Sequence, residues 1–163
     1  MEGDKTLKKV ILAEVFLALL LAGVMVLLLY KKEPKDVPLE KVREAVLSSC
    51  DLDGLEEAKD MRLKRAFGLN VSDYEEYLYF APDNTMSVNE FLIVKTFDAS
   101  QVSSVRAGIE SRLEAEKKAF DGYGVNQTEL LNNSKLIEEG RYVIFSCGEH
   151  ADEFIRAARE VWR

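Results

Sequence analysis

A long apolar run near the amino terminus constrains this chain more than any other feature. Residues 10–30, VILAEVFLALLLAGVMVLLLY, contain a single acidic or basic side chain, Glu14, in 21 positions. As a helix rising about 1.5 Å per residue, the run spans about 31 Å, close to the roughly 30 Å hydrocarbon thickness of a bilayer. Lysines flank it on both sides, where their stems can carry the charges to the headgroups. We therefore expect Val10 to Tyr30 to cross the lipid bilayer once.

A cleaved signal peptide is the main alternative to a retained anchor. Signal peptides have an apolar core of about 7 to 15 residues and a small-residue cleavage site, whereas this run is longer and lacks an A-x-A site. Leu21-Ala22-Gly23 resembles the segment before a lipoprotein cysteine. Val24 follows it, however, so no thiol is present for lipid attachment. We expect the helix to be kept as a signal anchor.

The apolar run divides the chain into four predicted segments. These are a cytoplasmic head, the transmembrane anchor, a charged stalk and one extracytoplasmic domain, at residues 1–9, 10–30, 31–37 and 38–163. Lysines before and after the run are balanced, so the positive-inside rule decides little. The predicted orientation, with the domain outside the cell membrane, rests on the short head and the large soluble part. A cytoplasmic domain with the opposite topology is the alternative.

The soluble part is acidic and carries no recognisable cofactor motif. Residues 33–163 contain 26 Asp and Glu against 17 Lys and Arg, which disfavours nucleic acid as a ligand because its binding needs a basic face. The run Asp51-Leu-Asp-Gly54 lacks the later oxygen ligands of a calcium loop. The glycines have no phosphate-binding spacing. We therefore predict no metal and no cofactor.

The two cysteines and the single histidine offer little for catalysis. Cys147 ends an apolar stretch beside Glu149, which is an unfavourable setting for a reactive thiolate paired with His150. Cys50 and Cys147 could form one bridge in an oxidising compartment, but we favour two separate thiols.

Apolar spacing predicts one α+β domain. Helical spacing predicts a first helix capped by Asp36 with Pro38 in its first turn, and a second over about 55–67 that ends at Gly68. Further helices are predicted after a cap at Asp98 or Ser100, over 126–133 and over 149–162. Aromatic and β-branched residues predict strands over 74–81, 86–96, 136–137 and 141–147, the first two as an antiparallel hairpin. The expected fold is a small antiparallel sheet of about four strands, packed against a long helix and a carboxy-terminal helix.

Aromatic residues of the first predicted strand are candidates for binding. Tyr77 and Tyr79 lie on one face of this strand, opposite Leu78 and Phe80. They could fill the core, which we favour, or line a groove for a glycan or a peptide. Glu14, about one turn inside the apolar run, is either a residue near the interface or a contact with a membrane partner.

Several blocks of the sequence together resemble one bacterial family. They are Tyr77-Leu-Tyr79, Glu90 to Lys95 with Asp98, Arg112-Leu113 with Phe120 and Tyr123, and Gly140-Arg-Tyr-Val143. This combination resembles the family catalogued as domain of unknown function 4358. The resemblance implies a small extracytoplasmic domain of Gram-positive bacteria, tethered by a lipid or helix and often encoded near O-acyltransferases of cell-surface polysaccharides. It implies no catalytic residue.

The chain departs from that family at two places. Val24 replaces the lipoprotein cysteine, so the helix must hold the protein. Arg141 stands where many relatives have a small polar residue, and we include it with Tyr77, Tyr79 and Glu14 among the candidate partner-binding residues.

Two functions are compatible with these observations. The first is a non-catalytic accessory domain that contacts a membrane or cell-envelope partner, with surface-polysaccharide modification machinery as one candidate. The second is a cell-envelope hydrolase or enzyme subunit that uses dispersed carboxylates such as Glu90, Asp98 and Glu149, because paired acids need no sequence motif.

Overall fold

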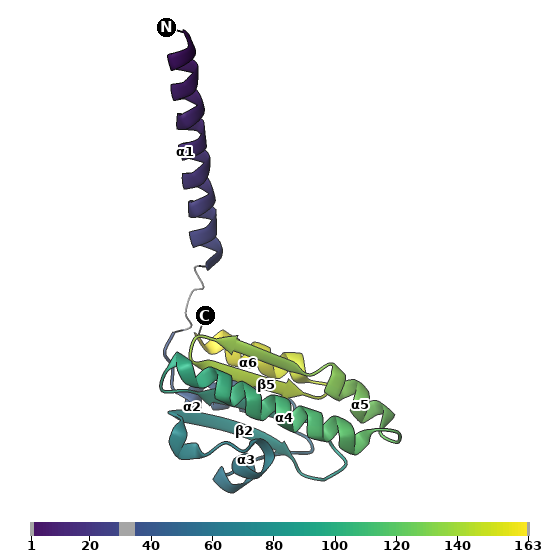
Figure 1. The fold of residues 1–163 in the computed structure, drawn as a ribbon. Helices are drawn as coiled ribbons and strands as arrows, with labels where there is room; N and C mark the ends of the chain where they lie inside the picture. Colours follow the sequence, from purple (N-terminus) through teal and green to yellow (C-terminus); the bar gives the residue numbers. More distant parts are fainter. Residues whose placement is uncertain (1, 30–34, 163) are drawn as a thin grey trace. The chain divides into compact units, whose positions relative to one another are not determined.

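The computed structural model describes residues 2–29 and 35–162, and the chain separates into two units, Met1–Glu33 and Pro34–Arg163 (Figure 1). Much of the predicted stalk, residues 31–34, lies outside the described residues, as does Tyr30, the last residue of the predicted anchor.

The first unit is the 28-residue helix α1, Glu2–Leu29. Its described large apolar side chains are all exposed: Ile11, Leu12, Val15, Phe16, Leu17, Leu19, Leu20, Leu21, Val24 and Met25. Glu14 is exposed on the same helix. Among the described residues, no helix combines the length and the apolar character that a membrane crossing needs.

The second unit is built on one antiparallel sheet. Its strand order is β1-β2-β3-β5-β4, and every neighbouring pair is antiparallel. The strands are β1 Leu55–Glu57, β2 Glu76–Pro82, β3 Glu90–Lys95, β4 Lys135–Glu139 and β5 Tyr142–Cys147. β3 and β5 lie side by side in the interior of the sheet and are buried along their whole length.

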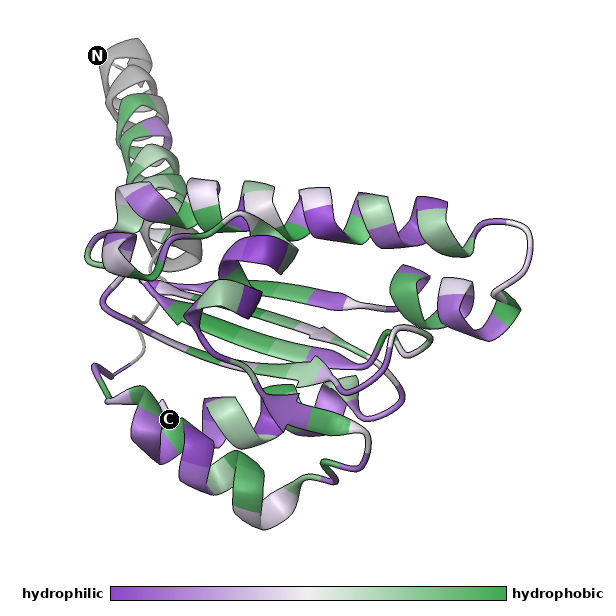
Figure 2. Ribbon diagram, turned by 90° about the horizontal axis from the view of Figure 1, so that it is seen from below, coloured by the Kyte–Doolittle hydropathy of each residue, from purple (hydrophilic) through white to green (hydrophobic). Residues whose placement is uncertain are grey.

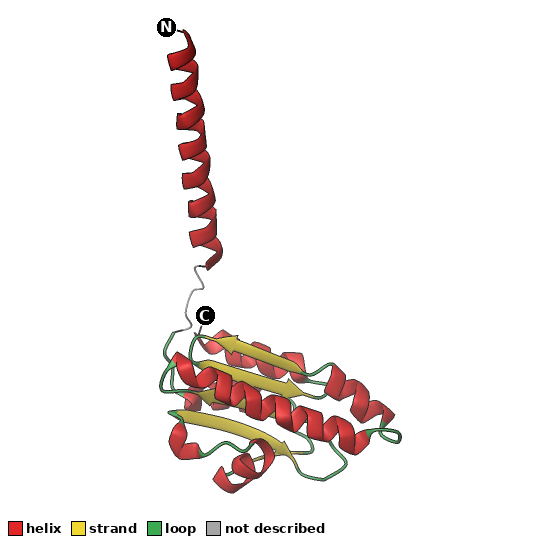
Figure 3. Cartoon of the chain, in the orientation of Figure 1, coloured by secondary structure: helices red, strands yellow, loops and turns green. Residues whose placement is uncertain are grey.

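Helices cover both faces of this sheet (Figures 1 and 3). One face carries α3 Asp60–Phe67, α4 Val102–Phe120 and α5 Val125–Asn132, and the other carries α2 Leu39–Ser49 and α6 Ala151–Trp162. Two short 3-10 turns, η1 Val71–Asp73 and η2 Ala99–Gln101, precede β2 and α4. Figure 2 shows the apolar strands lying between the two helical layers.

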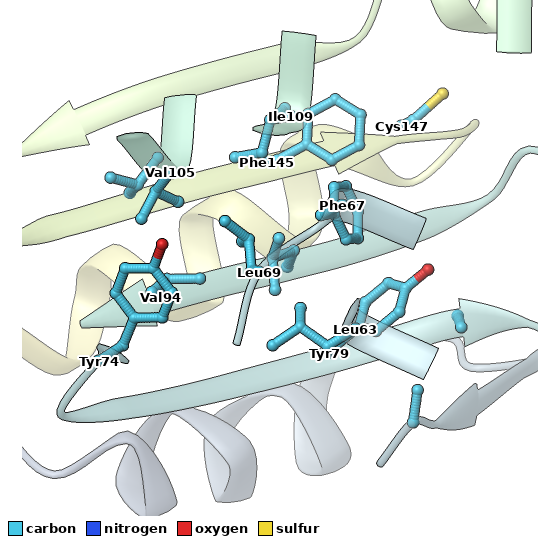
Figure 4. Packing of buried hydrophobic residues seen from close by; sticks show 14 of the residues in the cluster. Leu63, Phe67, Leu69, Tyr74, Tyr79, Val94, Val105, Ile109, Phe145 and Cys147 are labelled. Atoms are coloured by element: carbon cyan, nitrogen blue, oxygen red, sulfur yellow. The ribbon is translucent and has the colours of Figure 1, made fainter. Parts of the chain in front are cut away.

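The alternation of side chains along the strands produces two separate cores. Tyr79, Leu92 and Phe145 face α3 and α4, where Phe67 meets the Tyr79 ring edge-on at 5.2 Å between centroids (Figure 4). On the other face Phe91 stacks on Phe154 of α6 at 5.2 Å. The expected α+β class is confirmed, and the sheet is sandwiched between two helical layers.

The prediction of one helix over about 55–67 was wrong at its start. Leu55–Glu57 is instead β1, paired with the end of β2 through Leu55 opposite Pro82. Glu56 and Glu57 are exposed, so this edge strand has no apolar alternation and is held mainly by its backbone pairing. The helix begins at Asp60 and ends at Gly68 in the left-handed region, as expected. The sheet therefore has five strands.

Two further boundaries differ from expectation for local reasons. Asp36 does not cap α2; the carboxylate of Glu76 in β2 accepts the Leu39 N–H at 2.8 Å. β3 begins at Glu90 rather than Met86, because the Asn84 side-chain oxygen accepts the N–H groups of Met86 and Ser87, both at 3.0 Å, and folds them into a loop.

The two cysteines are separate free thiols, as favoured from the sequence. Cys50 packs with the cluster on the α2 and α6 face, whereas Cys147 belongs to the cluster on the α3 and α4 face. The sheet lies between them.

Close contact between α3 and α4 depends on Gly108. A Cβ atom at this position would lie 2.6 Å from the Phe67 carbonyl oxygen. Although alanine is favoured over glycine in helices by about 1 kcal/mol, we expect Gly108→Ala to lower the free energy of unfolding by about 1–3 kcal/mol through this overlap. Urea denaturation measures the change. The control is Ala107→Gly at an exposed position of the same helix, which measures the effect of helix propensity alone. A Gly108→Ala variant more stable than the wild type would contradict the predicted overlap with Phe67.

Candidate functional site

A cavity of about 570 Å³ opens between α3, α4 and the loop that joins β2 to β3. Three elements supply its walls, and Tyr79 of β2, 1 % exposed, forms part of the floor. The lining residues are Met61, Arg62, Arg65, Ala66, Tyr79, Pro82, Asp83, Asn84, Thr85, Ser87, Arg112 and Glu116. Cavities of about 300–1,000 Å³ are typical of small-molecule sites.

A buried polar network lies beneath this cavity. The Tyr79 hydroxyl donates to Glu90 Oε2 at 3.0 Å, and Arg112 Nε lies 3.5 Å from Glu90 Oε1. Arg112 also pairs with Glu116 one turn further along α4. Glu90 is only 2 % exposed, so Arg112 supplies the charge that makes a buried carboxylate tolerable at this position.

Burial governs the protonation of this network. It raises the pKa of Glu90 above its ordinary value, although Arg112 and the Tyr79 hydroxyl act in the opposite direction. Burial also raises the pKa of Tyr79, and the neighbouring Glu90 charge adds to that effect. The carboxyl can therefore hold a proton at a higher pH than an exposed glutamate.

A second charged cluster surrounds Lys95 on the opposite face of the sheet. Lys95, 3 % exposed, lies 2.7 Å from both Asp36 Oδ1 and Glu75 Oε1 and 3.3 Å from Glu76 Oε1. Although burial disfavours the ammonium, hydrogen bonds to these carboxylates raise the pKa of Lys95. The same hydrogen bonds from Lys95 hold the pKa values of Asp36 and Glu75 below their ordinary range.

Arg141 belongs to this second cluster. Its guanidinium pairs with Glu75 at 2.5 Å and Asp36 at 3.3 Å and donates to the Thr96 carbonyl at 3.0 Å. Next to it, the Tyr142 hydroxyl accepts the Val37 N–H at 3.0 Å. Arg141 thus fastens the first residues of the second unit to its sheet.

Of the four residues proposed from sequence, the three in the second unit do not form one site. Tyr79 fills the core, as favoured. Tyr77 is half-buried, donates to Asp60 at 2.5 Å and lines a separate cavity of about 310 Å³. Arg141 lies in the Lys95 cluster, and Glu14 is on α1, in the other unit.

Apart from Tyr79, the residues that line the large cavity were missed from sequence. Arg62 and Arg65 stand three positions apart on α3, and Arg112 and Glu116 stand four apart on α4, spacings that place each pair on one helix face. That signal was available. The loop residues Asp83 to Ser87 gave only a turn signal, and no local pattern indicates that the turn meets the two helices.

Other candidate groups for catalysis are dispersed. Cys147 and His150 line the same small cavity of about 190 Å³, but burial raises the pKa of the Cys147 thiol to about 12. Asp98 accepts the Ser100 N–H at 2.8 Å at the start of η2. Glu149 lines the small cavity together with His150 and is not among the residues that line the large one. No group of acidic, His or Cys side chains that could hold a metal ion is found among the described residues.

Comparison with protein families identifies residues 48–148 as a domain of unknown function (DUF4358). The chain belongs to the DUF4358 family. The DUF4358 match contains all five strands together with α3, α4 and α5. It therefore includes the large cavity, Glu90, Lys95 and Arg141, whereas α1 and α6 lie outside it. The comparisons found no matching curated protein and no matching solved structure.

The titration of Glu90 gives a first test of the network. Because its pKa is raised in the folded chain, Glu90 contributes stability that is fully present below about 4.5, the ordinary value, and is lost as pH rises through the folded pKa. We expect Glu90→Gln to remove this loss, so that the variant gains stability relative to the wild type as pH rises across that window. Urea unfolding at a series of pH values measures the difference.

The exposed Glu114→Gln variant on α4 is the matched control. A hydrogen bond from Lys118 lowers the pKa of Glu114. The stability that Glu114 contributes is therefore lost as pH falls, so the pH dependence of Glu114→Gln should be opposite in sign to that of Glu90→Gln. A difference between Glu90→Gln and the wild type that did not change with pH would contradict the assignment.

The Lys95 cluster gives a second test. Lys95→Met leaves Asp36, Glu75 and Glu76 without their shared cation. Because the Glu75 and Glu76 side chains are 31 % and 33 % exposed, water replaces part of the contact, and we expect a loss of about 2 kcal/mol rather than the roughly 3–5 kcal/mol of a fully buried pair. The lowered pKa values of Asp36 and Glu75 predict that this loss shrinks as pH falls below their ordinary values, 3.8 and 4.5.

Lys118→Met provides the comparison for Lys95→Met. Lys118 pairs with Glu114 on the surface, where both side chains are mostly exposed, so the change in unfolding free energy should stay within about 0.5 kcal/mol. Urea unfolding measures both changes in unfolding free energy. Equal changes for the two substitutions would show that burial of Lys95 does not increase the cost of losing its ion pairs.

Proposed function

We propose that this chain is a single-pass membrane-anchored accessory domain, exposed outside the cell membrane, which binds a membrane or cell-envelope partner. The observation that supports the proposal is the apolar surface of α1. An exposed apolar surface that extends from Ile11 to Met25 is unusual on soluble proteins and marks contact with a membrane or another protein.

The distribution of these side chains favours a lipid environment. Successive helical residues turn by about 100°, so Val15, Phe16 and Leu17 point to three different sides, and all three are exposed. A helix that is apolar on every side is typical of burial in a membrane or a large core. An amphipathic helix that docks on a protein surface would be apolar on one side alone.

The second unit supports a binding role more than a catalytic one. Its titratable groups are engaged with one another: Glu90 with Tyr79 and Arg112, and Lys95 with three carboxylates. These contacts stabilise the fold and leave none of these groups unpaired for proton transfer. A domain held at the envelope with a ligand-sized cavity fits an accessory protein.

An envelope hydrolase or enzyme subunit is the second candidate. The observation that favours it is the raised pKa of Glu90 beneath the cavity, since general acids commonly combine burial with a raised pKa. Turnover of cell-wall polymer by the purified chain, abolished by Glu90→Gln while the variant stays folded, would place this function ahead of the first.

Labelling of introduced cysteines tests anchorage and orientation together. In a Cys50→Ala background, Cys147 is buried and its raised thiol pKa keeps it unreactive. We expect a membrane-impermeant maleimide to label Asn132→Cys, an exposed position at the end of α5, in intact cells. Gly3→Cys in the head should react only after permeabilisation. The reverse pattern would establish a cytoplasmic domain, and labelling of both in intact cells would exclude a single crossing.

A further inference from the structure

We propose that the cavity between α3, α4 and the β2–β3 loop is a binding site for a neutral saccharide. This inference rests on the proposed function and names the chemical class of the envelope partner. It uses cavity residues other than the four singled out from the sequence, apart from Tyr79 in the floor.

The free polar groups at the cavity include both donors and acceptors. Arg65 is exposed and forms no ion pair with any residue that the structure describes. Thr85 contributes a hydroxyl, and Asp83 has one carboxylate oxygen left over when the other accepts from the Asn84 amide at 2.8 Å. A sugar hydroxyl both donates and accepts, so it suits a wall with both kinds of group.

The charges at the cavity nearly balance once the paired carboxylates just outside its lining are counted, which disfavours a charged ligand. Arg112 pairs with Glu116 and with the buried Glu90, and Arg62 pairs with Glu56 just outside the cavity. The two charges that remain, Arg65 and Asp83, are opposite in sign. An anion would need a surplus of basic groups, and a cation would need a surplus of acidic ones.

Apolar side chains complete the cavity with surface for the carbon–hydrogen faces of sugar rings. Met61 is 75 % exposed and lies at the edge of the cavity. Ala66 and Pro82 add apolar wall. A mainly apolar lining with a few polar groups that set orientation is typical of small-ligand sites.

The full-length chain in phosphatidylcholine nanodiscs provides the test, because maltoside and glucoside detergents carry sugar headgroups that would compete. Maltotriose, cellotriose, chitotriose and mannotriose are titrated separately, with glycerol phosphate and spermidine as anionic and cationic probes. We expect at least one trisaccharide to give saturable changes in the backbone amide signals of residues 61–66 and 83–87. The charged probes should give none there.

Variants of the free polar groups test the contacts. Arg65→Ala and Thr85→Val should each weaken binding of that trisaccharide by about tenfold, as expected for the loss of one or two hydrogen bonds. The matched control is Arg156→Ala, which removes an exposed arginine of α6 on the other side of the sheet. It should leave the affinity unchanged.

Three outcomes would overturn the proposal: no trisaccharide binds, the charged probes bind at this site in their place, or the signal changes lie elsewhere on the domain. These outcomes are independent of the labelling experiment. A chain that is anchored with its domain outside but binds no trisaccharide refutes the saccharide site and leaves the anchorage intact.

Discussion

The burial of β3 and β5 on both faces is the constraint on which the rest of the second unit depends. A strand that is apolar on both sides needs a covering layer on each, and α3 with α4 and α2 with α6 provide the two layers. Burial on both sides also fixes where polar residues can stand. Glu90 and Lys95, at the two ends of β3, face opposite layers, and each is accompanied by an opposite charge.

These two charged residues account for much of the local architecture around them. The buried carboxylate of Glu90 is paired with Arg112 on α4, and Arg112 is paired in turn with Glu116. Arg112 and Glu116 both line the large cavity, so this network contributes to its shape. A buried ammonium at Lys95 gathers carboxylates from β2 and from the residues before α2. Charged groups inside the sandwich thus specify contacts between segments that apolar packing alone would not specify.

The sequence predicted most helices and strands because their apolar spacing follows from burial on one face or two. It failed at β1, where Glu56 and Glu57 carry no apolar pattern, and at Asp36, whose partner Lys95 lies 59 positions away in the chain. For the same reason the large cavity could not be predicted. Arg65 and Thr85 come together only through the tertiary fold, and contacts between distant segments leave no local signal.

The attachment of residues 36–39 to the sheet has a mechanical consequence. Any pull on the chain before Lys35 is carried by Asp36 to Lys95, by Val37 to Tyr142 and by Leu39 to Glu76. These three contacts end on β3, β5 and β2, neighbouring strands of the sheet. Force therefore enters the domain through its most buried strands and is shared among them, and α2 is shielded from being peeled off the surface one turn at a time.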